Sequence, residues 1–126
     1  MKISFETAKL AREKGFNLPT NDYYYVEKNK IISDNGDGDN EFICLNHNFY
    51  DNYFSAPYQS SLQKWLRDIH NIDCHVMGVR FTGDIEIAYY TYAVQSIQPV
   101  GKQKYKFDSW EEALEVGLTI TLNLIE

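Results

Sequence analysis

Apolar residues recur with helical spacing in three stretches of the chain. The clearest stretch lies between Ser55 and Asn71, and its apolar positions are Tyr58, Leu62, Trp65, Leu66 and Ile69. These positions fall on one side of a helix, so they predict an amphipathic helix with one buried stripe. Ser55 is the expected N-cap, and Pro57 fits the first turn, where proline is tolerated.

A second helix is predicted at the start of the chain. Ser4 is its expected N-cap, and the helix continues to about Lys14. Gly15 fits the left-handed position that ends many helices, and Phe16 is placed for the apolar contact that follows it. The inward side is expected to contain Ile3, Thr7, Leu10 and Ala11.

The third helix is predicted at the other end, after the capping-box sequence Ser109-Trp110-Glu111-Glu112. Helical spacing of apolar residues then continues to Ile125. Gly117 lies in the middle of this helix, where glycine costs about 1 kcal/mol relative to alanine, so we expect close packing there. Trp65 and Trp110 each begin or lie on an apolar stripe, and both are expected to be core anchors.

Short β-branched and aromatic runs predict strands between these helices. The predicted strands are 23–26, which Ile31 and Ile32 continue after a polar break, then 42–45, 72–77 and 85–94, with a further short one at 104–107. Gly78 is expected to mark a bulge. The sequence therefore predicts one α+β domain covering residues 1–126, with an antiparallel sheet of about four strands and about three helices packed mainly on one face.

Composition and charge exclude several classes of function. The chain has 126 residues and a net charge of −6, and its lysines and arginines do not cluster as a phosphate-binding surface requires. Lys102, Lys104 and Lys106 alternate, which is typical of a solvated sheet edge. No stretch has the roughly 20 apolar residues of a membrane helix. We therefore expect a cytoplasmic protein that binds neither nucleic acid nor membrane.

The acidic run Asp34 to Glu41, DNGDGDNE, raises the question of a calcium site. An EF-hand loop needs oxygen ligands at positions 1, 3 and 5, glycine at 6 and glutamate at 12. A loop starting at Asp37 has Phe42 at position 6 and Asn48 at position 12, so the register fails. Asn-Gly and Asp-Gly dipeptides between apolar runs favour an exposed hairpin turn.

Metal and catalytic signatures are weak. The spacings Cys44-x2-His47 and His70-x3-Cys74 provide the weak candidates for a zinc site, but they match no common zinc-finger pattern. The alternation around Cys74 instead favours a small core residue. No nucleophile elbow or phosphate loop is present, so we expect no metal, no cofactor and no catalytic residue that the sequence identifies. A disulfide between the two cysteines is geometrically open but is not needed at this chain length.

The 10 tyrosines are a surplus for a small sheet. Tyrosine is enriched at protein interfaces, whereas partly exposed cross-strand tyrosine pairs are the alternative explanation. The strand 85–94 is apolar on both faces, and helices on one face would leave the other uncovered. The contact surface predicted on that uncovered face consists of Ala88, Tyr90, Tyr92 and Val94.

Two segments carry a resemblance to a known group of proteins. They are FSAPYQSSLQKWLRDIHNIDCHV (54–76) and FDSWEEALEVGLTITLNLI (107–125). Together they resemble small uncharacterised proteins encoded by phages, prophages and mobile elements of gut Bacteroidetes. The resemblance implies an origin and carries no catalytic residue.

Two functional hypotheses follow from the sequence. The first is a non-enzymatic phage or mobile-element accessory protein that acts through protein contact, by self-association as a homo-oligomer or with a protein partner. The alternative is a small hydrolase-like enzyme whose carboxylates or histidines meet only in the fold. A deep pocket with convergent polar groups favours the enzyme, and an exposed apolar patch favours the contact protein.

Overall fold

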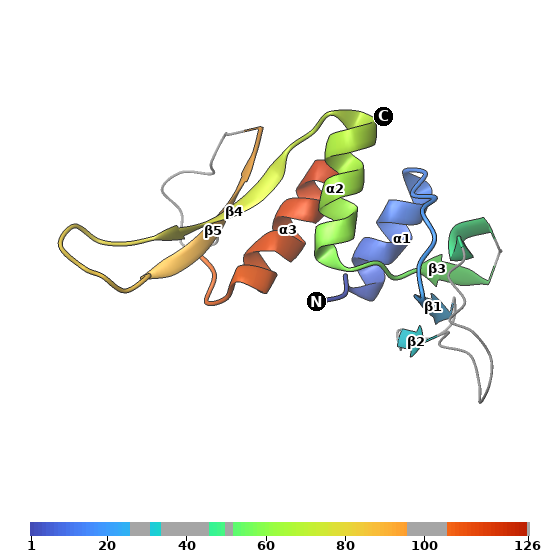
Figure 1. Ribbon diagram of the computed structural model, residues 1–126, viewed down its shortest axis with the longest axis horizontal. Coiled ribbons are helices and arrows are strands. Elements are labelled where there is room, and N and C mark those ends of the chain that lie inside the picture. Colours follow the sequence, from blue (N-terminus) through green and yellow to red (C-terminus); the bar gives the residue numbers. More distant parts are fainter. Residues whose placement is uncertain (26–30, 34–45, 50–51, 96–105, 126) are drawn as a thin grey trace. The chain divides into compact units, whose positions relative to one another are not determined.

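α-Helices and antiparallel strands both occur in the computed structural model, which describes residues 1–25, 31–33, 46–49, 52–95 and 106–125. The α+β class predicted from the sequence is therefore confirmed, and the described ranges contain three α-helices (Figure 1). The chain divides into two compact units, Met1–Ser61 and Leu62–Glu126. The described strands form two sheets rather than the single predicted sheet. That residues 1–126 fold as a single domain stays a prediction.

Helix α1 (Phe5–Glu13) begins and ends where the sequence predicts. The Ser4 hydroxyl accepts a hydrogen bond from the Thr7 backbone N–H at 3.2 Å, which satisfies one of the unpaired donors of the first turn. At the other end Gly15 has φ +93°, and the N–H of Phe16 donates to the carbonyl of Ala11 at 3.0 Å. This is the bonding of a Schellman stop, and it buries Phe16.

The sheet of the first unit contains β1 (Asp22–Tyr25), β2 (Ile31–Ser33) and β3 (Tyr53–Ser55) in the order β2-β1-β3, all antiparallel. α1 packs against β3, and the short 3₁₀ helix η1 (His47–Phe49) precedes that strand. Tyr24 is buried, and its hydroxyl donates to the carbonyl of Ile3 at 2.7 Å. The tyrosine therefore ties β1 to the segment that leads into α1. The strand predicted at 42–45 lies outside the described residues.

Helix α2 (Gln59–His70) carries the predicted stripe, but only its centre is buried. Leu62, Trp65 and Leu66 are 0–3% exposed, whereas Tyr58 and Ile69 at the two ends are 52% and 64% exposed. The helix begins four residues after the predicted cap, because Ser55 belongs to β3, where its backbone N–H donates to Asn48 Oδ1 at 2.8 Å. Trp65 is confirmed as a core residue.

The second unit contains the hairpin of β4 (Cys74–Val79) and β5 (Tyr89–Val94), and helix α3 (Trp110–Asn123) packs against both strands (Figure 1). The Ser109 hydroxyl caps α3 by accepting from the Glu112 N–H at 3.2 Å, as predicted. The predicted close packing at Gly117 is also confirmed. A Cβ added there would lie 2.9 Å from both Cys74 Sγ and Tyr92 Cβ.

Two details of this unit differ from the sequence prediction. Trp110 is 47% exposed at the first position of α3, and its ring packs edge-to-face with the Tyr90 ring, with the ring centroids 6.3 Å apart. It is therefore not a core anchor. Strand β5 begins at Tyr89 rather than at Ile85, and Ile85 lies in the exposed connection between the strands.

Candidate contact surface and pocket

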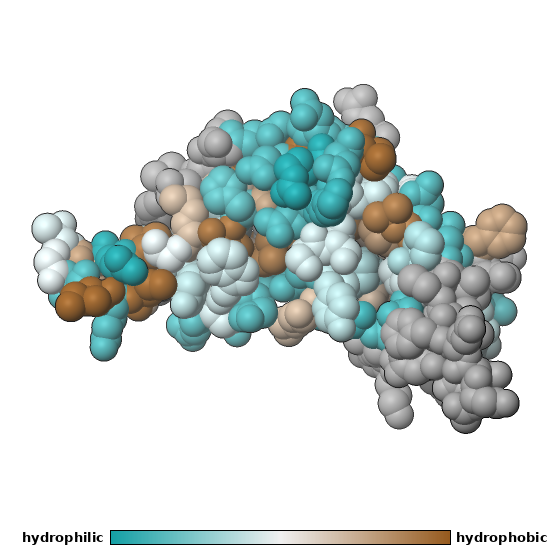
Figure 2. Space-filling model, viewed as in Figure 1, coloured by the Kyte–Doolittle hydropathy of each residue, from teal (hydrophilic) through white to brown (hydrophobic). Residues whose placement is uncertain are grey.

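The connection between β4 and β5 carries large apolar side chains that are exposed to solvent. Phe81, Ile85 and Ile87 are 60%, 88% and 40% exposed. Figure 2 shows hydrophobic side chains gathered at this end of the hairpin, and Figure 1 shows that the hairpin extends past the end of α3. We refer to these three side chains as the apolar tip. Isolated exposed apolar residues are common, but three in one connection form a patch of the kind that marks a contact surface.

Local geometry explains how the apolar tip is held. Gly83 turns the chain with φ +90°, and the Asp84 N–H donates to the carbonyl of Phe81 at 3.0 Å. On the way back, Ile87 covers the backbone of Gly78, since a Cβ added at Gly78 would lie 2.7 Å from Ile87 Cδ1. The absence of a side chain at Gly78 therefore lets Ile87 lie on the hairpin. The bulge predicted at Gly78 does not occur, because Gly78 pairs with Tyr90 in the regular register of the two strands.

The residues predicted to form an exposed contact surface lie mainly on a face of β5 that α3 covers. Tyr92 is 4% exposed because α3 covers it at Gly117, and Tyr90 contacts Trp110 from the same helix. Val94 is half-buried, and only Ala88 is exposed. Helix α3 packs on the face that the sequence predicts to be uncovered. The candidate contact surface is therefore the apolar tip and not these four residues.

Tyrosines of the first unit follow the alternative explanation for the tyrosine surplus. Tyr53 on β3 lies between Tyr23 and Tyr25 on β1, with ring centroids 4.5 Å and 5.9 Å apart. All three rings are half-buried. Cross-strand aromatic pairs stabilise a sheet, so these tyrosines have a structural role without any partner molecule.

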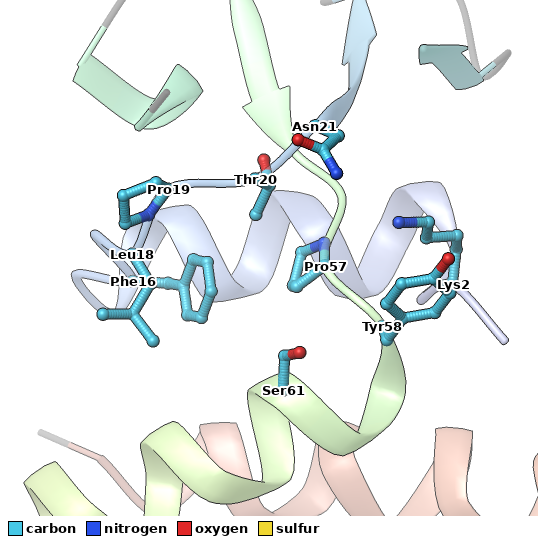
Figure 3. Close-up of a pocket in the computed structure, with 9 residues that line it drawn as sticks. All are labelled: Lys2, Phe16, Leu18, Pro19, Thr20, Asn21, Pro57, Tyr58 and Ser61. Carbon is cyan, nitrogen blue, oxygen red and sulfur yellow. The ribbon is translucent and has the colours of Figure 1, made fainter. Parts of the chain in front are cut away.

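A pocket of about 210 Å³ lies in the first unit (Figure 3). Its walls come from the N-terminal segment, the loop after α1 and the start of α2, and the residues are Lys2, Phe16, Leu18, Pro19, Thr20, Asn21, Pro57, Tyr58 and Ser61. The volume exceeds the roughly 150 Å³ that holds benzene and falls below the roughly 300 Å³ of drug-sized sites. The pocket therefore suits one ring-sized group.

The positive charge of Lys2, which lines this pocket, is neutralised by Asp22. Lys2 Nζ lies 2.8 Å from Asp22 Oδ2 and 3.6 Å from the centre of the Tyr58 ring. Thr20 donates its hydroxyl hydrogen to the Asp22 carbonyl at 2.9 Å. The Oδ1 atom of Asn21 is buried without a hydrogen-bond partner. No histidine lines the pocket, and its charged lysine is held by a carboxylate, so an acid–base pair for hydrolysis is not assembled among its lining residues.

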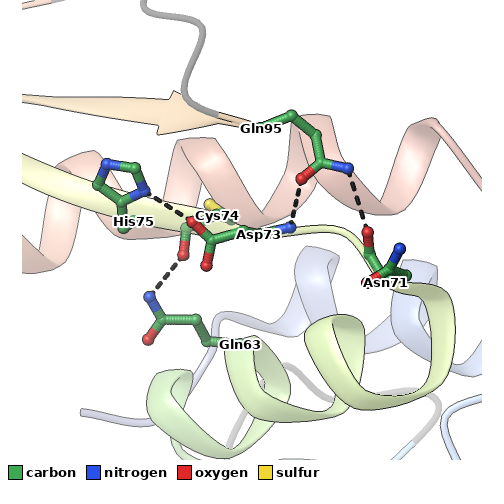
Figure 4. Close-up of polar contacts among 6 residues, drawn as sticks. All are labelled: Gln63, Asn71, Asp73, Cys74, His75 and Gln95. Carbon is green, nitrogen blue, oxygen red and sulfur yellow. Dashed lines mark hydrogen bonds and ion pairs between the residues drawn. The ribbon is translucent and has the colours of Figure 1, made fainter.

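A polar cluster surrounds the start of β4 (Figure 4). Gln95 links the two strand ends, since its Oε1 accepts from the Asp73 N–H at 3.0 Å and its Nε2 donates to the Asn71 carbonyl at 3.1 Å. His75 Nδ1 lies 3.0 Å from Asp73 Oδ2, and both side chains are substantially exposed. Asp73 and His75 orient each other's side chains, and Gln95 ties Asp73 to the end of β5, so these contacts join the start of β4 to the end of β5.

The weak zinc candidates are only partly within the described residues. Cys44 and the side chain of His47 lie outside them. Cys74 is fully buried, and burial raises the pKa of its thiol, with the nearby Asp73 charge acting in the same direction. The buried His70 Nε2 has no hydrogen-bond partner, and the His70 ring lies 4.7 Å from that of Trp65. In the described ranges no group of three or more His, Cys, Asp or Glu side chains is arranged to hold a metal ion.

Sequence reasoning missed both the apolar tip and the pocket. The sequence predicts the turn at Thr82-Gly83-Asp84, but it also predicts a strand from Ile85 to Val94 that is central or covered on both sides, so Ile85 and Ile87 are not expected to be exposed. Alternation identifies residues on a common face without showing whether anything covers that face. The pocket has no sequence signal, because its walls come from separate segments of the first 61 residues.

No protein-family model, no curated protein and no solved structure matches this chain. Among the described helices, none combines the length and apolar character required to cross a bilayer.

Proposed function

We propose that this protein is a non-enzymatic accessory protein of a phage or mobile element that acts through protein contact. The apolar tip carries the contact part of this proposal, because Phe81, Ile85 and Ile87 project into solvent at the end of a hairpin. When a partner covers such side chains, each Å² of apolar surface removed from water stabilises the complex by about 25 cal/mol. The mobile-element origin rests on the resemblance of segments 54–76 and 107–125, and the bacterial cytoplasm is the compartment that fits it.

The test replaces two side chains of the apolar tip, as Phe81→Ser together with Ile85→Ser. Both are exposed, so the free energy of unfolding should change by about 0.5 kcal/mol or less. Binding to an isolated host partner should be lost. The matched control is Val116→Ser with Ile120→Ser, which makes the same chemical change at two 37%-exposed positions on α3 and should leave association intact.

Two results would contradict this assignment. One is a wild-type protein that stays monomeric at high concentration and binds no host protein. The other is an association that survives Phe81→Ser with Ile85→Ser and disappears in the α3 control, which would place the contact surface on the helix.

A second candidate function is the binding of a small ligand in the pocket of the first unit. The observation that favours it is the ring-sized volume of about 210 Å³ between Phe16, Pro57 and Tyr58. Pro57→Gly would widen one wall while Leu18→Trp would fill the opening, so the two variants should change ligand affinity differently. A fragment screen by NMR that produces no shifts at Phe16 or Tyr58 would eliminate this candidate.

A further inference from the structure

The backbone groups of β4 divide into those that face β5 and those that face away. In an antiparallel pair, the N–H and C=O groups of alternate residues point to the same side. The Gln95 N–H donates to the Asp73 carbonyl at 2.7 Å, so Asp73 is directed toward the β5 side. By alternation, Cys74, Val76 and Gly78 direct their backbone groups to the opposite, outer edge of β4.

The other end of the hairpin agrees with this assignment. Tyr90 pairs with Gly78 in the register of the two strands. The Tyr90 backbone exchanges two hydrogen bonds with Phe107, both 2.9 Å, and so it points away from β4. Gly78 therefore points outward as well. Among the described strands, this sheet contains β4 and β5, and none of the others pairs with the outer edge of β4.

This edge lacks the devices that usually prevent strand pairing. Exposed edges are commonly protected by lysine, proline or an inward-pointing charge. The sequence of β4, Cys-His-Val-Met-Gly-Val, contains none of these, and the charged residue next to it, Arg80, lies beyond the end of the strand. The Gln63 side-chain amide donates a hydrogen bond to the carbonyl of Cys74, so the Cys74 end of the outer edge is already occupied. The open part of the edge is therefore Val76 to Arg80.

We propose that the outer edge of β4 pairs antiparallel with β4 of a second copy of this chain, forming a four-stranded sheet. This deepens the proposed function, on which it rests, by naming the contact partner. The outward residues of the open part are Val76, Gly78 and Arg80, so a twofold axis through Gly78 pairs each with an outward residue of the other copy. Gly78 then faces the partner's Gly78, and Met77 lies opposite the partner's Val79.

Self-complementarity favours a second copy over an unrelated peptide. The two side chains brought together across the interface, Met77 and Val79, are both apolar and half-buried in one copy. Cross-strand apolar pairs of this kind stabilise antiparallel sheets. Gly78 at the axis is exposed and presents no side chain to hinder the approach of the two backbones. The paired segment contains one charged residue, Arg80, and the twofold axis sets it opposite Val76 of the other copy, so the pairing brings no like charges directly opposite each other.

Amide hydrogen exchange combined with sedimentation tests the pairing directly. In dilute protein the inward amides of Met77 and Val79 should be protected and the outward amides of Val76 and Gly78 should exchange rapidly. At concentrations where sedimentation reports a dimer, the outward amides should become protected as well. Protection of Val76 and Gly78 that follows the dimer fraction is specific to edge pairing, because contact through the apolar tip alone leaves these amides open.

Charge variants provide a second, independent measurement. Met77→Lys with Val79→Lys places like charges opposite each other in the dimer, and the dissociation constant should rise by about tenfold or more. Mixing this variant with Met77→Glu and Val79→Glu should restore a dimer that contains one chain of each. Val116→Lys with Ile120→Lys on α3 adds the same charge elsewhere, and it should leave the dissociation constant within about threefold of wild type.

The outcomes separate this proposal from the one on which it rests. Outward amides that stay unprotected in a dimer, or a lysine–glutamate mixture that fails to form a mixed dimer, would overturn the edge pairing. If the protein stays monomeric but Phe81→Ser with Ile85→Ser abolishes binding to a host partner, the edge pairing is wrong and the contact function stands. If neither pair of substitutions affects any association, both proposals fail.

Discussion

Single residues explain how tightly α3 lies on the hairpin. Gly117 brings the helix backbone against Cys74 and Tyr92, and the two 2.9 Å distances from an added Cβ show that even a methyl group lacks space there. Real Cβ atoms do not approach other carbon or sulfur atoms so closely. The glycine therefore offsets its unfavourable helix propensity by permitting a contact that alanine would obstruct.

The substitution Gly117→Ala should accordingly destabilise the protein. Alanine gains about 1 kcal/mol in helix propensity, but forced overpacking of a core costs about 1–3 kcal/mol, and the obstructing atoms include Tyr92 Cβ, which follows the backbone. Because Tyr92 Cβ cannot move away, the cost falls in the upper part of that range, about 2–3 kcal/mol, and we expect a net loss of about 1–2 kcal/mol in the free energy of unfolding measured by urea denaturation. Val116→Ala, one position earlier and more exposed, should change it by about 0.5 kcal/mol or less. A Gly117→Ala variant more stable than wild type would disprove the close packing.

Cys74 leads to a prediction about reactivity and pH. Burial raises the pKa of its thiol above the ordinary value of 9.0, Asp73 adds to the increase and a hydrogen bond with Thr121 opposes it. Because the folded pKa is the higher one, the stability contributed by the neutral thiol is complete below pH 9.0 and falls as the pH rises above it. In a Cys44→Ser background, alkylation of Cys74 by iodoacetamide at pH 8 should be about 100-fold slower than in urea. Equal rates would show that the thiol is accessible.

At the scale of elements, helix ends and helix starts followed local rules that the sequence contains. Ser4 and Ser109 cap α1 and α3, and Gly15 ends α1, because each needs only its own neighbours. The start of α2 was predicted too early, since Ser55 fits a cap locally but pairs with Tyr23 in the sheet. Tertiary pairing therefore overrode a local preference.

The candidate surface was less predictable than the fold. A contact surface depends on which face of a strand remains uncovered, and that depends on where a helix distant in sequence packs. The sequence identified the apolar character of 85–94 but not the side on which α3 lies, so Tyr92 was predicted to be exposed and Ile85 to be in a strand. The apolar tip depends on the solvent exposure of Phe81, Ile85 and Ile87 in the folded chain, which the sequence does not contain.

Trp65 on α2 and Trp110 on α3 differ in burial, and replacing each one by alanine tests this difference. Trp65 is 3% exposed at the centre of its stripe, and Trp110 is 47% exposed at the first position of its helix. Trp65→Ala should lower the free energy of unfolding by about 3–5 kcal/mol, as large-to-small core changes do. Trp110→Ala should cost about 1–2 kcal/mol, because about half of this side chain is already in water. Equal losses for both variants, measured by urea denaturation, would contradict this difference.

At the scale of the whole molecule, the question is whether the two compact units fold together. Each unit has roughly 60 residues, a size at which a single hydrophobic core provides only marginal stability. Helix α2 spans residues 59–70 and the boundary between the units falls after Ser61, so the helix begins in one unit and continues in the other. A helix forms cooperatively, and melting one part of it removes stabilising hydrogen bonds from the adjoining turns.

We therefore expect one cooperative unfolding transition for residues 1–126. Trp65 fluorescence reports the second unit and the amide exchange of Tyr24 reports the first, and both should yield the same free energy of unfolding. Arg67 is exposed within α2, so Arg67→Gly weakens the helix by about 1 kcal/mol relative to the control Arg67→Ala. This loss should appear equally at Trp65 and at Tyr24, although Arg67 belongs to the second unit alone. Two separate transitions, or a loss confined to Trp65, would mean that the chain contains two independently folding units and that the single domain predicted from its length is wrong.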